Sequence, residues 1–169
     1  MLEMFYPDEY LDSAYDIDYD RLYRDGYRGL IYDIDNTLVP HGAPADERAI
    51  ALFRHLKELG FSYCLLSNNQ IERVSSFADA IDAQFIENAH KPSVRNYKKA
   101  MELLETNTGN TIFIGDQLFT DVYGAKRSGI RNILVKPIHP KEEIQIVLKR
   151  YLEKIVLFFY ARYRKKQNR

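Results

Sequence analysis

Carboxylates follow two apolar segments of this 169-residue sequence at positions where strands are expected to end. Asp33 and Asp35 come directly after the apolar residues GLIY, and Asp116 follows the apolar residues TIFIG. Carboxylate oxygens suit Mg²⁺, and the four histidines show no metal-ligand spacing. A carboxylate that faces a bound phosphoryl group can act as a nucleophile. These residue types therefore predict phosphoryl chemistry assisted by Mg²⁺.

Further polar side chains stand where they could hold a phosphoryl group. Ser67 supplies a hydroxyl, Lys91 supplies a positive charge, and Asp121 lies about one helical turn after Asp116. Backbone N–H groups at the start of a helix also suit a phosphate. Asn68 either contributes to phosphate binding or stabilises the turn after its strand. Both hypotheses for the role of Asn68 therefore stay open.

The elements that must position these residues alternate along the chain. Apolar runs predict strands at 29–34, 61–66, 84–86, 111–115 and 131–135. Amphipathic patterns and Gly or Pro boundaries predict helices at 45–59, 70–82, 93–105, 120–128 and 141–163. Such alternation predicts an α/β fold with a parallel sheet covered on both faces. Ligands of these sheets bind beyond the carboxyl ends of the strands, which is where the polar residues fall.

The segment DIDNTLV resembles the first motif of the haloacid dehalogenase (HAD) superfamily. Ser67, Lys91 and the segment GDQLFTD follow in the order of that superfamily's other motifs. The sequence most resembles the YqeG-like phosphatases of subfamily IIIA, which are similar to phosphatidylglycerophosphate phosphatases. This resemblance implies a three-layer Rossmann-like HAD fold over roughly residues 29–136.

The resemblance also implies roles for individual residues. Asp33 is expected to attack phosphorus and form an aspartyl-phosphate, and Asp35 to serve as general acid and then general base. Mg²⁺ is expected at Asp33, Asp116 and the backbone carbonyl of Asp35. We expect Asp121 to orient the metal's surroundings, and Ser67, Asn68 and Lys91 to bind the phosphoryl group.

The substrate is less well defined by these motifs. Residues 40–60 and 68–90 are too few to hold a cap domain, so we expect an open, uncapped site. Dephosphorylation of phosphatidylglycerophosphate to phosphatidylglycerol is the leading hypothesis. The alternatives are a phosphatase for a soluble metabolite, nucleotide or phosphoprotein, and a non-catalytic phosphoryl-binding module. Retention of Asp35 favours turnover over mere binding.

We expect the chain to have three parts, and the first and last differ strongly in net charge. Residues 1–28 form a Tyr-rich acidic segment expected to pack on the core, 29–140 the phosphatase core, and 141–169 a helix with a basic aromatic tail. Net charge is −7 over residues 1–35 and +7 over 149–169, although the whole chain is neutral. The tail at 149–166 predicts either peripheral contact with an anionic membrane or a helix that packs Ile155, Leu157 and Phe158 on the sheet or on another subunit.

Composition narrows the remaining partners and the location. The single cysteine, Cys64, excludes an intrachain disulfide and favours a reducing compartment. The apolar run at 155–161 is much shorter than the ~20 residues of a membrane span. We therefore expect a cytoplasmic protein, peripheral on the inner membrane face if the tail binds lipid. No motif indicates nucleic-acid binding.

Overall fold

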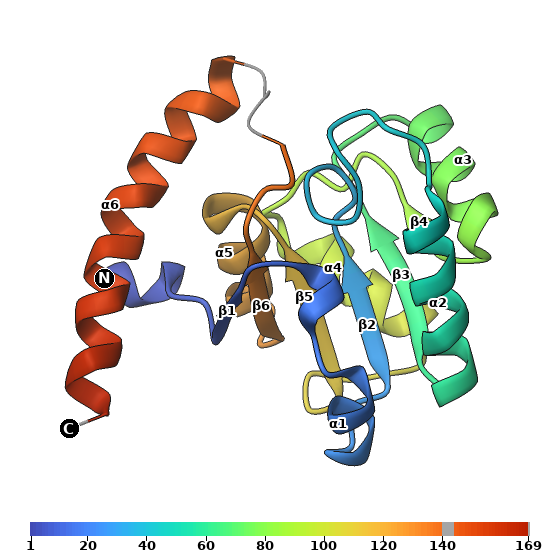
Figure 1. The fold of residues 1–169 in the computed structure, drawn as a ribbon, viewed down its shortest axis with the longest axis horizontal. Coiled ribbons are helices and arrows are strands. Elements are labelled where there is room, and N and C mark those ends of the chain that lie inside the picture. Colours follow the sequence, from blue (N-terminus) through green and yellow to red (C-terminus); the bar gives the residue numbers. More distant parts are fainter. Residues whose placement is uncertain (140–143, 169) are drawn as a thin grey trace.

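A computed structural model describes residues 1–139 and 144–168 of the chain. It contains a six-stranded parallel sheet in the order β1-β6-β5-β2-β3-β4 (Figure 1). The strands are β1 (Glu9–Leu11), β2 (Gly29–Tyr32), β3 (Ser62–Leu66), β4 (Gln84–Ile86), β5 (Thr111–Gly115) and β6 (Arg131–Val135). The predicted α/β fold with a parallel sheet is confirmed.

Helices connect the strands, and one long helix follows the last strand. The longer helices are α2 (Glu47–Leu59), α3 (Ile71–Ile81), α4 (Val94–Leu103) and α6 (Ile144–Gln167). The shorter ones are η1 (Leu2–Phe5), η2 (Ala14–Asp16), α1 (Tyr19–Arg24), the π-helix η3 (Leu118–Val122) and α5 (Tyr123–Arg127). The predicted boundary at 140–141 and the predicted helical residues 141–143 lie outside the described residues.

The two faces of the sheet bury alternate residues of the same strands, as the pleat requires. On one face, Leu30 and Tyr32 of β2 pack with Phe53 of α2 and with residues of α3. On the other face, Ile31 packs with residues of α4 and α5, including Tyr97. Figure 1 shows these helices on opposite sides of the strands. The result is the three-layer arrangement, with the carboxyl ends of the strands left uncovered by any inserted domain between β2 and β4.

Strand β1 and the short helices around it were not predicted from the sequence. β1 pairs in parallel with β6 at the edge of the sheet. Asp8 secures this pairing, because its carboxylate accepts hydrogen bonds from the backbone and side-chain nitrogens of Asn132, both at 2.9 Å. The Tyr15 hydroxyl then donates to the Leu38 carbonyl at 2.7 Å. The N-terminal segment thus supports the loop that follows β2.

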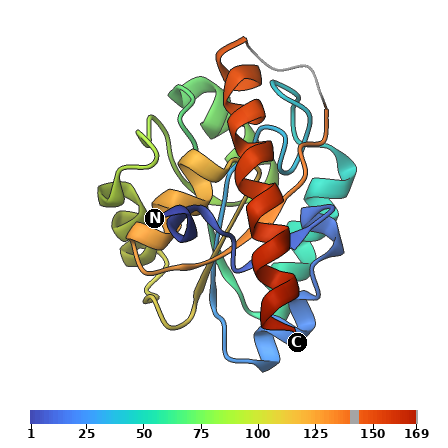
Figure 2. The same cartoon turned by 90° about the vertical axis from the view of Figure 1, so that its left-hand side faces the viewer.

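Helix α6 lies beside the β1–β6 edge of the sheet and next to η1 (Figure 2). It packs through Val156 and Tyr160, which are buried, and through the buried Glu153. Ile155 and Phe158 are 56% and 57% exposed, so the predicted packing of these two residues on the sheet is wrong, while their packing on another subunit stays a prediction. The reason is helical phase, because both project from the outer side of the helix. Within the described residues, no helix combines the length and apolar character needed to cross a bilayer.

Candidate active site

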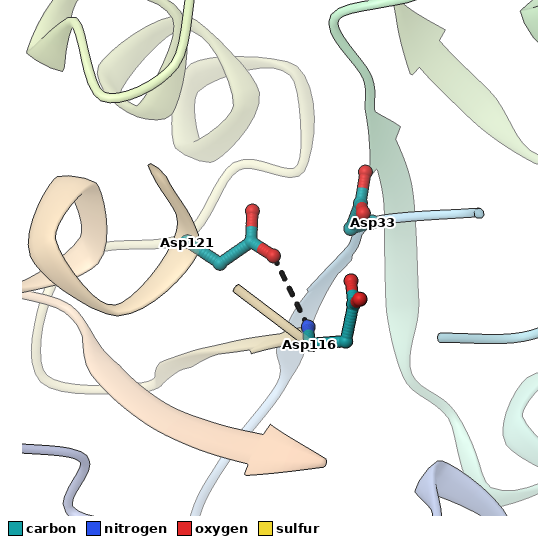
Figure 3. A group of neighbouring side chains, drawn as sticks. All are labelled: Asp33, Asp116 and Asp121. Atoms are coloured by element: carbon teal, nitrogen blue, oxygen red, sulfur yellow. Dashed lines mark hydrogen bonds between the residues drawn. The ribbon is translucent and has the colours of Figure 1, made fainter. Parts of the chain in front are cut away.

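Three carboxylates meet where β2 and β5 end. Asp33 follows β2, Asp116 follows β5, and Asp121 lies in η3. One oxygen from each lies within 4.8 Å of the others, and all three residues are buried (Figure 3). The parallel pairing of β2 with β5 produces this meeting, because it places both carboxyl ends side by side.

Burial and mutual repulsion raise the pKa values of Asp33 and Asp116 in this cluster. Burial, together with the charge of Asp121, raises the pKa of Asp33 to about 6, although Lys91 opposes the shift. Burial and the charges of Asp33 and Asp121 raise the pKa of Asp116 well above its ordinary value. An additional cation would relieve both shifts, since it would favour the ionised carboxylates. The donor set of hard oxygens therefore fits a divalent metal ion.

Lys91 connects two members of the cluster. Its Nζ donates to the carboxylate of Asp33 at 2.8 Å and to that of Asp121 at 2.7 Å. The Lys91 side chain is only 3% exposed. Burial acts to lower the pKa of Lys91, but the two carboxylates outweigh this effect and raise it. Lys91 is therefore a fixed positive charge directly beside Asp33.

Asp121 is held by backbone donors as well as by Lys91. One of its oxygens accepts from the Asp116 N–H at 3.1 Å (Figure 3). The same oxygen accepts from the Gln117 N–H, also at 3.1 Å. Gly115 makes this approach feasible, because a Cβ at that position would lie 2.4 Å from the Asp121 carboxylate. Thr37 donates to the other side of the site, to Asp116 at 3.1 Å. These contacts hold Asp116 in place from both directions.

Asp35 does not join the carboxylate cluster. β2 ends at Tyr32, so the alternation of a strand does not extend to Asp35. Its carboxylate accepts from the Gly42 N–H at 2.7 Å, from Arg73 of α3 at 2.9 Å, and from the Asn69 side chain. Each of the two aspartates thus has its own cation: Lys91 for Asp33 and Arg73 for Asp35. Arg73 was not identified from the sequence, because it lies in the interior of a helix outside the motifs.

Ser67 and Asn68 follow β3, and their side chains make different hydrogen bonds. The buried Ser67 hydroxyl oxygen accepts from the Asn69 N–H at 3.1 Å. The Asn68 side-chain oxygen accepts from the Lys91 N–H at 2.8 Å, which ties the loop after β3 to the loop after β4. Asn68 therefore has a structural contact, whether or not its amide nitrogen also binds phosphate.

Helix α6 contributes two residues that sequence reasoning missed. Arg150 donates to the backbone carbonyl of Asp116 at 2.6 Å and also to its carboxylate. Glu153 accepts from the Leu118 N–H at 2.8 Å and from Arg150 at 2.9 Å. The basic character of this segment was visible in the sequence, but its meeting with Asp116 depends on where α6 packs.

Comparison with known proteins agrees with this geometry. The HAD-hydrolase-like family model matches residues 88–143. The chain is 35% identical over 159 residues to a Bacillus subtilis protein named "Probable phosphatase YqeG", covering 93% of this chain and 92% of that one. It is 29% identical over 164 residues to phosphatidylglycerophosphate phosphatase 1 of Arabidopsis thaliana, covering 82% of this chain and 45% of that protein.

A solved structure supports the fold independently. The cobalt-bound deoxy-D-mannose-octulosonate 8-phosphate phosphatase of Haemophilus influenzae superposes with a TM-score of 0.51 at 11% identity. The match covers 67% of this chain and 80% of that one. With the near full-length similarity to YqeG, these findings show that the chain belongs to the HAD-like phosphatases, in the group that contains YqeG.

Proposed function

We propose that this phosphatase hydrolyses phosphomonoesters through an aspartyl-phosphate at Asp33, and that its substrate is phosphatidylglycerophosphate. The observation that carries the reaction is the buried pair of Asp33 and Lys91, 2.8 Å apart, at the carboxyl ends of the strands. Lys91 stabilises the ionised form of Asp33 and would offset charge on a phosphoryl group beside it. An attacking carboxylate needs both effects.

The proposed chemistry has two steps. In the first, a carboxylate oxygen of Asp33 bonds to phosphorus, the ester P–O bond breaks, and Asp35 gives its proton to the leaving alcohol. In the second, Asp35 takes a proton from water, the water oxygen attacks phosphorus, and the bond to Asp33 breaks to release inorganic phosphate. Asp35 accepts two hydrogen bonds at Oδ1 and one at Oδ2, which leaves a position on Oδ2 for the proton that it transfers.

Phosphate binding is assigned to Ser67, Asn68 and Lys91. Because the Ser67 oxygen accepts from the Asn69 N–H, its own hydrogen remains available to donate to a phosphoryl oxygen. The Asn68 oxygen is engaged with the Lys91 N–H, so only its amide nitrogen is assigned to phosphate. These three groups supply donors from two neighbouring strand ends.

Mg²⁺ is the cofactor that we assign to the carboxylates. Asp33, Asp116 and the backbone carbonyl of Asp35 would hold it, and Asp121 would orient Asp116 through the backbone. When bound, the ion would offset negative charge on the cluster and on the phosphoryl group. The buried, mutually repelling carboxylates are the observation that supports this assignment.

Three features favour a lipid-linked substrate at a membrane surface, which we place on the cytoplasmic side. Among the described residues, no domain is inserted between β2 and β4 to cover the site, so a phosphate presented on a large surface can reach it. Over residues 149–166, α6 exposes apolar side chains such as Leu152, Ile155 and Phe158 beside basic residues. Such a surface fits peripheral contact with an anionic membrane. The Arabidopsis relative is itself named for this lipid phosphate.

Phosphate release from phosphatidylglycerophosphate in mixed micelles tests the proposal. The assay runs with and without Mg²⁺, beside a panel of soluble phosphomonoesters, with Asp33→Asn as the blank. Strong Mg²⁺-dependent preference for the lipid supports the full proposal. Turnover of soluble esters alone would keep the mechanism and overturn the lipid substrate, and no turnover above the blank would overturn the reaction.

A further inference from the structure

A groove of about 630 Å³ separates α6 from the β1–β6 edge of the sheet. This volume falls in the range of roughly 300–1,000 Å³ that is typical of small-molecule sites. Its walls come from β6 and the residues after it on one side and from α6 on the other. The apolar lining residues are Leu134, Val135, Pro137, Val147 and Leu157.

The groove borders one residue of the carboxylate cluster. Asp116 lines it and also belongs to the carboxylate cluster with Asp33. Arg150 stands at this junction, where it binds both the backbone and the carboxylate of Asp116. A ligand with its phosphate at the cluster would have to pass Arg150 to place the rest of its length in the groove.

The lining of the groove is mainly apolar, with basic side chains beside it. Lys154 contributes positive charge, whereas Arg150 is paired with Asp116 and Glu153, and Lys136 is paired with Asp12. Apolar walls with a basic edge suit a molecule that has a negatively charged head and an apolar chain. A sugar phosphate, which is polar along its whole length, would leave the apolar walls without complementary contacts.

We propose that this groove, which borders the carboxylate cluster at Asp116, binds the apolar chain of the phosphorylated substrate. The inference rests on the proposed function and deepens it, because it defines a subsite for the non-reacting part of the substrate. The class of ligand is a phosphomonoester joined to an alkyl or acyl chain.

Alkyl phosphates of increasing length test the subsite, used below the concentrations at which they form micelles. We expect kcat/KM to be at least about tenfold higher for octyl phosphate than for ethyl phosphate, since each buried methylene can contribute up to about fourfold. Val147→Phe narrows the groove, whereas Leu148→Phe changes an exposed residue of the same helix outside the groove lining. The tenfold preference should be lost in Val147→Phe and kept in Leu148→Phe. Retention of the preference in both, or its loss in both, would overturn the subsite.

A binding measurement separates this inference from the proposed reaction. The chain contains no tryptophan, so Tyr151→Trp places a single fluorescent reporter in the groove lining. Octylphosphonate should shift its emission to shorter wavelength, and methylphosphonate should not. A shift without hydrolysis of any phosphomonoester would support the groove and overturn the proposed function. Hydrolysis without a shift would overturn the groove alone.

Discussion

Arg150 of the last helix holds Asp116 at the end of β5, through the backbone carbonyl at 2.6 Å and through the carboxylate. The Arg150 side chain is 15% exposed and that of Asp116 is fully buried. A helix outside the central sheet thus supplies a charge to the carboxylate cluster of the candidate active site. Glu153 reinforces the contact, because it binds both Arg150 and the Leu118 N–H.

Removing the Arg150 charge should destabilise the protein, and bound Mg²⁺ should restore part of the lost stability. Arg150→Met leaves the buried carboxylate of Asp116 without its guanidinium, and loss of one partner of a buried pair costs roughly 3 kcal/mol. Mg²⁺ should therefore raise the thermal midpoint of Arg150→Met more than that of the wild type. Differential scanning calorimetry with and without Mg²⁺ measures this. Lys149→Met, an exposed neighbour on the same helix, is the control and should behave as wild type. Equal Mg²⁺ effects in all three proteins would contradict the prediction.

Lys91 should be essential for folding stability as well as for catalysis. Lys91→Met leaves Asp33 and Asp121 as buried carboxylates without their shared cation, which should lower the free energy of unfolding by about 3–5 kcal/mol. Denaturant titration measures the loss. Combining the change with Asp121→Asn should recover part of it, because one unpaired charge is removed. Lys98→Met on the exposed side of α4 serves as the control. A variant as stable as this control would refute the interpretation.

The pH dependence of metal-free stability should reflect Asp33. Its pKa is raised to about 6 in the folded protein, against ~3.9 in an unfolded chain. The folded state therefore binds this proton more tightly, so its stabilising contribution is complete below pH ~4 and is lost as pH rises through about 6. A shift of about two pKa units corresponds to ~3 kcal/mol.

Unfolding free energies in EDTA between pH 4 and 7.5 test this expectation. Asp33→Asn should show a smaller decrease across this range than the wild type, since it lacks the titrating group. Mg²⁺ should reduce the wild-type decrease, because metal binds the ionised carboxylates. Parallel pH profiles for wild type and variant would show that Asp33 does not titrate in this range.

Asp35→Asn should separate catalysis from metal binding. Loss of a general acid–base group typically lowers the rate by about 10²–10⁴-fold. The Asp35 carboxylate lies outside the cluster of Asp33, Asp116 and Asp121, so stabilisation by Mg²⁺ should persist. Phosphate release and Mg²⁺-dependent thermal shifts are measured on the same samples. Full activity in Asp35→Asn would remove the acid–base assignment, and a lost Mg²⁺ shift would place its side chain among the metal ligands.

Much of this protein followed from its sequence alone. The alternation of apolar runs and amphipathic segments predicted the parallel sheet, because strand and helix periodicities are local properties of the chain. The polar residues after those strands predicted the place of the site, since parallel strands bring their carboxyl ends to one edge. Asp33, Lys91, Asp116 and Asp121 do meet there.

Only the tertiary structure decided the rest. β1 pairs with a strand that lies more than a hundred residues later, and the Asp8–Asn132 contact that secures it spans 124 positions. Arg73 and Arg150 reach Asp35 and Asp116 from helices whose own patterns do not encode what they face. Which residues of α6 are buried likewise depended on its docking angle. Local periodicity defines elements and their order, whereas contacts between distant elements are set by packing in three dimensions.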